Sequence, residues 1–444
     1  MRKIDDEIQA LLSEHRGDIR SILKDNHRLD LLYALSSQRE LLLEWYDFEP
    51  EAEVLQVGAD YGALTGLLRS SVSAVTVLDE TESALETVRQ RYPGAANIYY
   101  RKDSLAGYAA EACAEGKKYD YVIFAGTLTA PYEKHIHAAK SLLKPDGILI
   151  VALANALGMK YFAGTVEEEN ALTKRQLAEL LCGDKETQSM ADESGTLKFY
   201  YPMPDYKTPV SIYSDAYLPK KGDLTRVTPA YDYPPYHLME QGEKFDTVCE
   251  AGLFDLYANS YLVFWSADPK QLQKDDERIF IKYNKTRREE FQIKTCICER
   301  NVIGAAGASG AAGADATGNS AAGKKERYVE KAALSLDGSA HIASFKEKYE
   351  KLTKQHRTLK VAEPKFAEHR NSVFFPYLVG ETCAEKLGEQ LEGGQLPLDV
   401  LQIVMNQIYD ISPECRSAFV RTADFDEVFG ADLTEEEQNL LLSD

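Results

Sequence analysis

Glycines follow a short apolar stretch near residue 55, and their spacing can bring a ligand close to the protein backbone. Val54–Val57 is mostly apolar, glycines stand at positions 58, 62 and 66, and leucines follow at helical spacing. The pattern predicts a buried parallel strand, a tight turn and a helix packed back on the sheet. Backbone N–H groups at the start of such a helix can bind a polar or anionic group. The same spacing also suits a close-packed corner that binds nothing.

Acidic residues end the next two predicted strands. Asp79 closes the stretch A-V-T-V-L-D, and Asp103 follows the strand at Ile98–Arg101. In a doubly wound sheet, an acid at the first of these places accepts hydrogen bonds from ribose hydroxyls. At the second place, Asp103 would contact the edge of an adenine ring. One aspartate at a strand end is also a common helix N-cap, so the order of the three features together predicts a nucleoside-containing ligand.

The elements that position these residues alternate between strand and helix from residue 52 onward. Strands are predicted at Val54–Val57, Ala74–Leu78, Ile98–Arg101, Tyr119–Phe124 and Gly147–Leu153, with helices between them. Strand–helix pairs of this length predict an α/β fold with a doubly wound, mostly parallel sheet.

Two further strands are predicted on either side of an insertion rich in proline and tyrosine. They are Leu197–Tyr201 and Tyr257–Trp265, and the insertion runs over residues ~202–256. A capping box at Thr173 and Gln176 predicts the start of the helix before them. We expect the prolines to keep the insertion from forming a central strand.

The chain is long enough for more than one hydrophobic core, at 444 residues. We predict four parts, which are an N-terminal helical cap, the α/β domain, a smaller α+β domain with a flexible Gly/Ala loop at 301–323, and an acidic C-terminal tail. Their predicted bounds are 1–48, 49–268, 269–410 and 411–444. Within the cap, Leu29–Trp45 predicts a single helical stretch, and its second half could also touch a ligand.

Residues ~50–268 resemble class I S-adenosylmethionine-dependent methyltransferases. The resemblance lies in V-L-Q-V-G-A-D-Y-G, V-L-D, D-S, Y-D-Y-V-I-F-A-G and L-L-K-P-D-G-I-L-I-V-A. It implies a Rossmann-like sheet of seven strands with an antiparallel final strand, and S-adenosylmethionine as the cofactor. The implied roles are contact with the methionine part for Gly58, Asp60 and Gly62, with ribose for Asp79, and with adenine for Asp103.

Asp60 departs from the family pattern, which has a glycine at this position of the turn. The side chain must either point away from the cofactor, with backbone strain if φ is positive, or meet the cofactor's ammonium group. We expect cofactor binding to be retained. Its loss would leave a degenerate module.

A nicotinamide cofactor is the alternative for a glycine turn followed by an acid. It fits less well, because the glycines are not spaced as G-x-G-x-x-G and the closing strands differ from that fold.

A narrower similarity, over Ala154–Gly164 and Tyr200–Pro219, is to bacterial methyltransferases associated with cell-surface glycan assembly. That group has an arginine where this chain has Ala156. The similarity and the place after the fifth strand make Asn155, Lys160 and Tyr161 the predicted substrate residues.

Aromatic residues of the insertion are further candidates for the acceptor site. Tyr206, Tyr213 and Tyr236 could stack on sugar rings or form a packed aromatic lid, and His237 lies among them. Methyl transfer is an in-line displacement that needs mainly orientation, and no catalytic base stands out. His135 and His137 cannot share one helix face, so we expect them to lie on a solvated surface.

The region ~278–410 faintly resembles the small lobe of a protein-kinase-like phosphotransferase. Lys331 would be the phosphate-binding lysine and Glu350 its partner on the following helix. No glycine-rich phosphate loop and no catalytic H-x-D or D-F-G sequence accompanies them. We therefore expect a docking or remnant module that binds a biosynthetic protein partner.

A formal net charge of −20 argues against nucleic acid as a partner. The longest apolar runs are far too short to span a bilayer, and acids follow the first three residues where a secretory signal would be apolar. The seven cysteines show no metal-ligand spacing. We expect a cytoplasmic, metal-free methyltransferase for a small or glycan-linked acceptor. The alternative is a non-catalytic scaffold that docks a biosynthetic enzyme.

Overall fold

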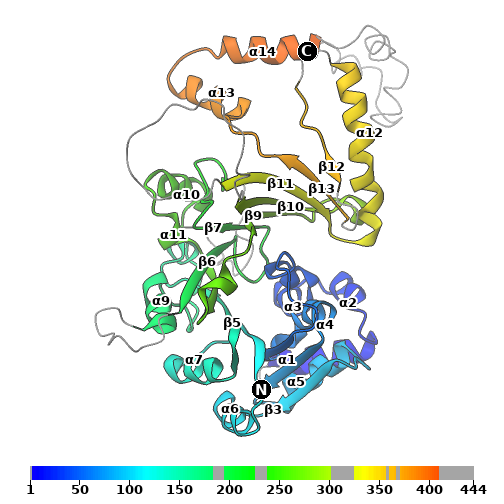
Figure 1. Cartoon of the computed structure of the whole chain (residues 1–444), viewed down its shortest axis with the longest axis vertical. Coiled ribbons are helices and arrows are strands. Elements are labelled where there is room, and N and C mark those ends of the chain that lie inside the picture. The colour runs from blue at the N-terminus through cyan, green and yellow to red at the C-terminus, as the bar shows by residue number, and fades with distance from the viewer. Residues whose placement is uncertain are drawn as a thin grey trace, which may run out of the picture. The chain divides into compact units, whose positions relative to one another are not determined.

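The computed structural model describes residues 3–183, 195–225, 238–301, 325–356, 360–366 and 371–409 (Figure 1). The chain divides into two compact units. The first comprises Met1–Arg287 and Ile293–Arg327, and the second comprises Arg288–Gln292 and Tyr328–Asp444. His237, Tyr236 and the predicted acidic tail lie outside the described residues. The predicted domain bounds stay predictions.

Helices open the first unit. They are α1 (Lys3–Glu14), α2 (Ile19–Asp25), α3 (Leu29–Leu35) and the 3-10 turn η1 (Ser37–Leu42). Ile8, Leu12 and Ile22 of these helices are fully buried against one another. The prediction of one helix over Leu29–Trp45 was wrong. The backbone of Ser36 is extended, and its hydroxyl accepts a hydrogen bond from the N–H of Gln38, which starts a new turn.

Five parallel strands form one end of the sheet, and these five strands were predicted. They are β1 (Glu53–Val57), β2 (Ala74–Asp79), β3 (Ile98–Lys102), β4 (Tyr119–Ala125) and β5 (Leu143–Ala154), in the order β3-β2-β1-β4-β5. Val54 pairs with Val75 on one side and with Tyr121 on the other. The apolar runs of these strands are buried on both faces because helices cover the sheet.

Two more strands complete the arrangement that the resemblance implied. β8 (Ser260–Ser266) lies antiparallel beside β5, and β6 (Thr196–Met203) lies antiparallel beside β8. The order is therefore β3-β2-β1-β4-β5-β8-β6, with β8 as the antiparallel strand. This is a Rossmann-like sheet.

The sheet does not stop at seven strands, and this prediction is corrected: over the described residues it contains 13 strands. In the first unit β7 (Ser211–Ser214), β9 (Asp276–Asn284) and β10 (Ile293–Asn301) follow β6, each antiparallel to its neighbour. Asn301 thus ends a strand rather than opening the predicted loop, whose other residues lie outside the described part.

The expectation that the insertion forms no central strand was also wrong. β7 lies between β6 and β9. Its four residues fall between Pro209 and Pro219 and include no proline, so every N–H of the strand is available for pairing.

Helices lie on both faces of the sheet, with α4 and α5 on one side and α6 and α7 on the other (Figure 1). The glycine turn contains the 3-10 turn η2 (Asp60–Gly62). Beyond β1 in the sequence, this unit contains the helices α4 (Thr65–Ser71), α5 (Glu82–Arg91), α6 (Leu105–Ala114), α7 (Tyr132–Ser141), α8 (Met159–Phe162), α9 (Lys174–Cys182), α10 (Gln241–Glu250) and α11 (Phe254–Tyr257). The capping box at Thr173 and Gln176 is present.

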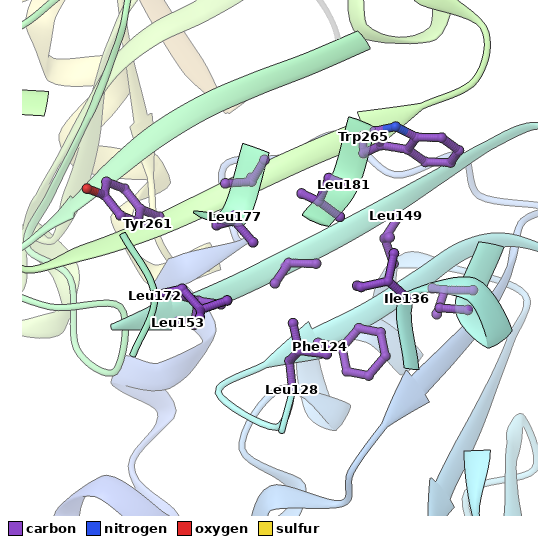
Figure 2. Packing of buried hydrophobic residues seen from close by; sticks show 14 of the residues in the cluster. Phe124, Leu128, Ile136, Leu149, Leu153, Leu172, Leu177, Leu181, Tyr261 and Trp265 are labelled. Atoms are coloured by element: carbon purple, nitrogen blue, oxygen red, sulfur yellow. The ribbon is translucent and has the colours of Figure 1, made fainter. Parts of the chain in front are cut away.

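The larger core lies between α6, α7, α9 and one face of the sheet (Figure 2). Leu177 and Leu181 of α9 are fully buried there, together with Leu149 and Leu153 of β5. Burying each such side chain contributes about 1.5–3 kcal/mol. This packing holds α9, and with it the chain leading into the insertion, against the strands.

The second unit carries β11 (Lys325–Ala333) from Tyr328 onward, β13 (Ser372–Pro376) and β12 (Lys365–Phe366), with β13 antiparallel to both others. Its helices are α12 (Ser339–Gln355), α13 (Cys383–Glu392) and α14 (Leu398–Tyr409). Glu350, which was predicted to lie on a helix, is in α12. In the part of the chain that the structure describes, no helix has the length and apolar character needed to cross a membrane.

We predict that Leu177→Ala lowers the free energy of unfolding by about 2–5 kcal/mol, because it opens a cavity in the packed core. Unfolding in guanidinium can be followed by tryptophan fluorescence, since Trp45 and Trp265 both belong to the first unit. Val166→Ala is the control, because Val166 is 81% exposed and should leave the midpoint unchanged. Equal midpoints for the two variants would contradict the packing described.

Candidate active site

The strand order reverses between β1 and β4, because β2 and β3 lie on one side of β1 and β4 and β5 on the other. In open α/β sheets, ligands bind outside the carboxyl ends of the strands at such a switch point. We call the ends of β1, β2 and β4 and the loops that follow them the switch-point site. The predicted cofactor residues Gly58, Asp60, Gly62 and Asp79 all lie here.

The glycine turn after β1 packs tightly against the loop after β4. Gly58 has φ of +86°, and a Cβ atom on it would lie 2.5 Å from Cγ2 of Thr127. The hydroxyl of Thr127 donates a hydrogen bond of 2.5 Å to the carbonyl of Val57. Gly58 is therefore required both by its left-handed backbone and by the close approach of Thr127.

Asp60 and Tyr61 adopt left-handed backbone conformations, with φ of +41° and +55°. Such conformations cost non-glycine residues about 1–3 kcal/mol and persist where surrounding contacts fix them. Here the carboxylate of Asp60 accepts a hydrogen bond of 2.5 Å from Nη2 of Arg39. The hydroxyl of Tyr61 donates to Asp5, and Arg91 donates to the carbonyl of Tyr61. Contacts from α1, η1 and α5 thus hold the turn.

Arg39 is buried, with 6% of its surface exposed, and its second amino group donates to the carbonyl of Tyr33. Burial lowers the pKa of Arg39, but the negative charges of Asp60 and of nearby Asp205 outweigh it, so the net pKa shift is upward. The group stays a cation beside the glycine turn. Neither outcome expected for Asp60 named this contact: the carboxylate meets a cation that belongs to the protein itself.

Asp79 and Asp103 lie at adjacent strand ends, joined by a hydrogen bond from the N–H of Asp103 to the carbonyl of Asp79. One carboxylate oxygen of Asp79 accepts from the N–H of Ala59, and the other accepts from Thr81. Oδ1 thus already accepts two hydrogen bonds, from the N–H and the hydroxyl of Thr81, whereas Oδ2 accepts one and can accept a second, and Asp79 is only half-buried. Asp79 therefore braces the glycine turn and keeps capacity for a hydroxyl ligand.

Tyr206 of the insertion reaches the loop after β4. Gly126 has φ of +80°, and a Cβ atom on it would lie 2.6 Å from the hydroxyl of Tyr206. Tyr206 is 3% exposed, and its hydroxyl donates to Oε2 of Glu168 over 3.3 Å. Tyr213, by contrast, packs in the core against Phe254 and Phe280.

A buried ion-pair cluster fixes the loop that carries Tyr206. The ammonium of Lys160 contacts Asp205 at 2.6 Å and Glu168 at 2.8 Å, and Lys207 contacts Glu168 at 3.2 Å. Burial lowers the pKa of Lys160, but the charges of Asp205 and Glu168 outweigh it, and the net shift is upward. The predicted substrate residue Lys160 is thus committed to carboxylates of the protein itself.

The other predicted substrate residues lie after β5, as expected. Asn155 is fully buried, donates to the carbonyls of Leu256 and Ala258, and accepts from the N–H of Leu157. The hydroxyl of Tyr161 accepts from the N–H of Glu168, and burial raises its pKa to about 12. The role of these residues in binding substrate stays a prediction.

Groups outside the site carry no chemistry that we assign. His135 on α7 is half-buried, with its ring in contact with the carbonyl of Thr129, and His137 is exposed. A pocket lies near the amino ends of the parallel strands, beside Trp45, Tyr200 and Phe264. That is the opposite edge of the sheet from the switch point, since the lining includes Asp276 at the start of β9, a strand that runs in the same direction as β5.

The sequence did not point to Arg39, Glu168 or Asp205 as site residues. Arg39 stands in the polar run S-S-Q-R-E before L-L-L, where a charged residue is ordinary, so the local sequence does not mark it as buried. Glu168 and Asp205 lie in loops whose paths depend on the insertion, so no local pattern marks them.

No family model and no curated protein matches the chain. Similar solved structures include a phosphoethanolamine N-methyltransferase of Haemonchus contortus, at 12% identity over 59% of this chain and 48% of that chain, with a TM-score of 0.34. A SAM-dependent methyltransferase of Streptococcus mutans is 12% identical over 51% of this chain and 47% of its own, with a TM-score of 0.32. This chain thus spans about half the length of each.

A third similar structure is a complex of the Haloferax volcanii Trm112 methyltransferase activator with a methyltransferase. It is 13% identical over 60% of this chain and 97% of that chain, with a TM-score of 0.33. TM-scores this low carry no argument about function. The assignment of the sheet to the Rossmann-like class rests on its strand order.

We predict that Lys160→Met lowers the free energy of unfolding by about 3–5 kcal/mol, because it leaves two buried or half-buried carboxylates without their shared cation. Arg175→Met is the matched control, since it removes an ion pair with Glu179 in which the arginine is 83% exposed. Guanidinium unfolding should show a large shift for the first variant and little for the second. Similar shifts would mean that the cluster does not fix the loop.

Proposed function

We propose that residues 49–268 form a methyltransferase domain that uses S-adenosylmethionine. The single observation that carries the proposal is the glycine turn at the switch point of a sheet ordered β3-β2-β1-β4-β5-β8-β6, with Asp79 at the next strand end. A glycine turn suits a ligand that approaches the backbone, and Asp79 suits one with ribose hydroxyls. Together they favour a nucleoside cofactor over a purely structural corner.

The residues present fit this cofactor. Gly58 and Gly62 would lie along its methionine part, Asp79 would accept from its ribose hydroxyls, and Asp103 would lie near its adenine. When bound, the cofactor supplies an electrophilic methyl group on a sulfonium. The chain's own part in such a reaction is to bind and orient both partners and to exclude water.

The pair formed by Arg39 and Asp60 gives the methionine part a specific partner. An α-amino acid head carries an ammonium and a carboxylate, and Asp60 and Arg39 present the complementary charges 2.5 Å apart beside the glycine turn. Insertion of the head between them exchanges one ion pair for two. In this proposal Asp60 does not block the site but binds the ammonium, and Arg39 binds the carboxylate.

For the acceptor we propose a small or glycan-linked molecule, with a place in bacterial cell-surface polysaccharide assembly. The support is the resemblance after β5 and the insertion that brings Tyr206 to the loop after β4. Tyr213 packs in the core and is not part of this proposal. Region 278–410 would then serve as a kinase-like docking module, with Lys331 on β11 and exposed Glu350 on α12.

A non-catalytic scaffold is the second candidate. The observation that favours it is that the site residues already have partners within the protein. Arg39 pairs with the carboxylate of Asp60, and Ala59 and Thr81 donate hydrogen bonds to the carboxylate of Asp79. Absence of cofactor binding, together with capture of a biosynthetic enzyme by the chain, would support this reading over catalysis.

We predict that the full chain binds S-adenosylhomocysteine in isothermal calorimetry and that Asp79→Ala weakens binding about tenfold or more, because hydrogen bonds to a charged group are lost. Asp268→Ala is the control, since Asp268 also accepts a backbone N–H but follows β8 at the opposite edge of the sheet. No binding at millimolar ligand would refute the proposed function. Unchanged affinity in Asp79→Ala would remove only the ribose assignment.

The role of the ion pair is tested by a ligand that lacks the amino acid head. In the double variant Arg39→Met/Asp60→Asn neither charge is left unpaired, and we predict that affinity for S-adenosylhomocysteine falls about tenfold. Affinity for 5′-methylthioadenosine, which lacks the head, should stay the same. Equal losses for the two ligands would show that the pair only holds the fold of the turn.

A further inference from the structure

Tyr206 stands out in the switch-point site because it is a large polar side chain from a distant segment, held in one place. Its hydroxyl lies against Gly126, the residue that directly follows β4. A Cβ atom added to Gly126 would lie 2.6 Å from the hydroxyl oxygen of Tyr206. Lys160 and Lys207 anchor its loop through Asp205 and Glu168, and the N–H of Lys207 also donates to Asp205. The hydroxyl therefore has little freedom to move away.

The direction of its hydrogen is fixed by Glu168. Oε1 of Glu168 contacts Lys160 and Lys207, and Oε2 accepts from the hydroxyl of Tyr206 at 3.3 Å. Burial raises the pKa of Tyr206 well above its ordinary value, and the charges of Glu168 and Asp205 raise it further. The group is therefore a neutral phenol whose single hydrogen is committed to a carboxylate.

A phenol has one hydrogen to donate and lone pairs that accept. With its hydrogen on Glu168, Tyr206 has only lone pairs left to offer a ligand. An incoming O–H or N–H group can donate to these lone pairs. A carboxylate or a fully ionised phosphate has no hydrogen to donate and would meet lone pair against lone pair.

We propose that Tyr206 positions the methyl acceptor by accepting a hydrogen bond from it, and that the acceptor group is therefore a hydroxyl or an amine. This inference rests on the proposed function and deepens it, because it names the chemical class of the acceptor. A hydrogen bond from the acceptor's O–H or N–H to Tyr206 would orient that atom and leave its own lone pair free to attack the methyl carbon. The new bond to carbon would form as the S–C bond of the sulfonium breaks, with S-adenosylhomocysteine as the leaving group. The acceptor's proton would pass to the oxygen of Tyr206 as the phenol's own proton passes to Glu168. Glu168 acts through Tyr206 as a positioning residue, since it sets the direction of the phenol hydrogen.

The experiment compares two cofactor analogues, so the natural acceptor does not need to be known. Sinefungin carries an amine in the place of the transferred methyl group, whereas S-adenosylhomocysteine carries nothing there. The amine therefore reports whether an acceptor of N–H hydrogen bonds lies at that position. Affinities of the full chain for both analogues are measured by calorimetry for the unaltered chain, Tyr206→Phe and Glu168→Gln.

We predict that the unaltered chain prefers sinefungin and that Tyr206→Phe reduces this preference about tenfold, with unchanged affinity for S-adenosylhomocysteine. Glu168→Gln should reduce the preference as well, because its amide can donate to the phenol oxygen and turn the hydrogen toward the ligand. Tyr213→Phe is the matched control. It lies in the same insertion but packs in the core, and it should leave both affinities unchanged.

Three results would overturn the inference or its basis. Equal losses for both analogues in Tyr206→Phe would mean that the ring only packs the site, and the inference would be wrong while the proposed function stood. An unchanged preference would place Tyr206 away from the methyl position, with the same consequence. Failure of the unaltered chain to bind either analogue would instead refute the proposed function itself.

Discussion

The ion pair between Arg39 and Asp60 is the interaction on which the site depends. It links the N-terminal helices to the turn after β1, and it stabilises a turn in which two consecutive non-glycine residues adopt left-handed conformations. Because Arg39 is buried, removing Asp60 alone would leave an unpaired cation inside the protein, and removing Arg39 alone would leave a carboxylate. The N-terminal segment is therefore part of the site and not only a cover for the sheet.

Buried charge recurs on the other side of the switch point. Lys160, Asp205 and Glu168 bring together the segment after β5 and the insertion after β6. In both clusters a cation from one chain segment pairs with an acidic residue of another. These pairs bring segments that are distant in sequence together at the ends of β1 and β4. Such pairs need not add stability over apolar packing, but they specify which segments come together.

The sequence predicted well what depends on neighbouring residues. The strands at Val54–Val57 and Tyr119–Phe124 and the capping box at Thr173 follow from apolar periodicity and local hydrogen bonding, and the structure confirms them. It predicted poorly what depends on partners far along the chain. β7 is a central strand only because β9 pairs with it, some 70 positions later, as the register of Ile212 with Ile281 shows.

The candidate site shows the same division. The glycine turn and Asp79 were recognisable, because their order along the chain is itself the signal. The partner of Asp60 was not recognisable, since Arg39 lies 21 positions earlier, in a segment whose residue pattern is typical of a helix. Lys160 was recognised as a charged residue in the right place, but its pairing with Asp205, 45 positions later, was not visible.

The most direct measurement is an experimental structure of the full chain with S-adenosylhomocysteine. The account predicts that the ligand lies across the carboxyl ends of β1 and β2, with its amino acid head between Arg39 and Asp60 and its ribose on Asp79. A ligand bound elsewhere on the chain would contradict it. So would a head group that makes no contact with Arg39 or Asp60 while their mutual ion pair stays intact.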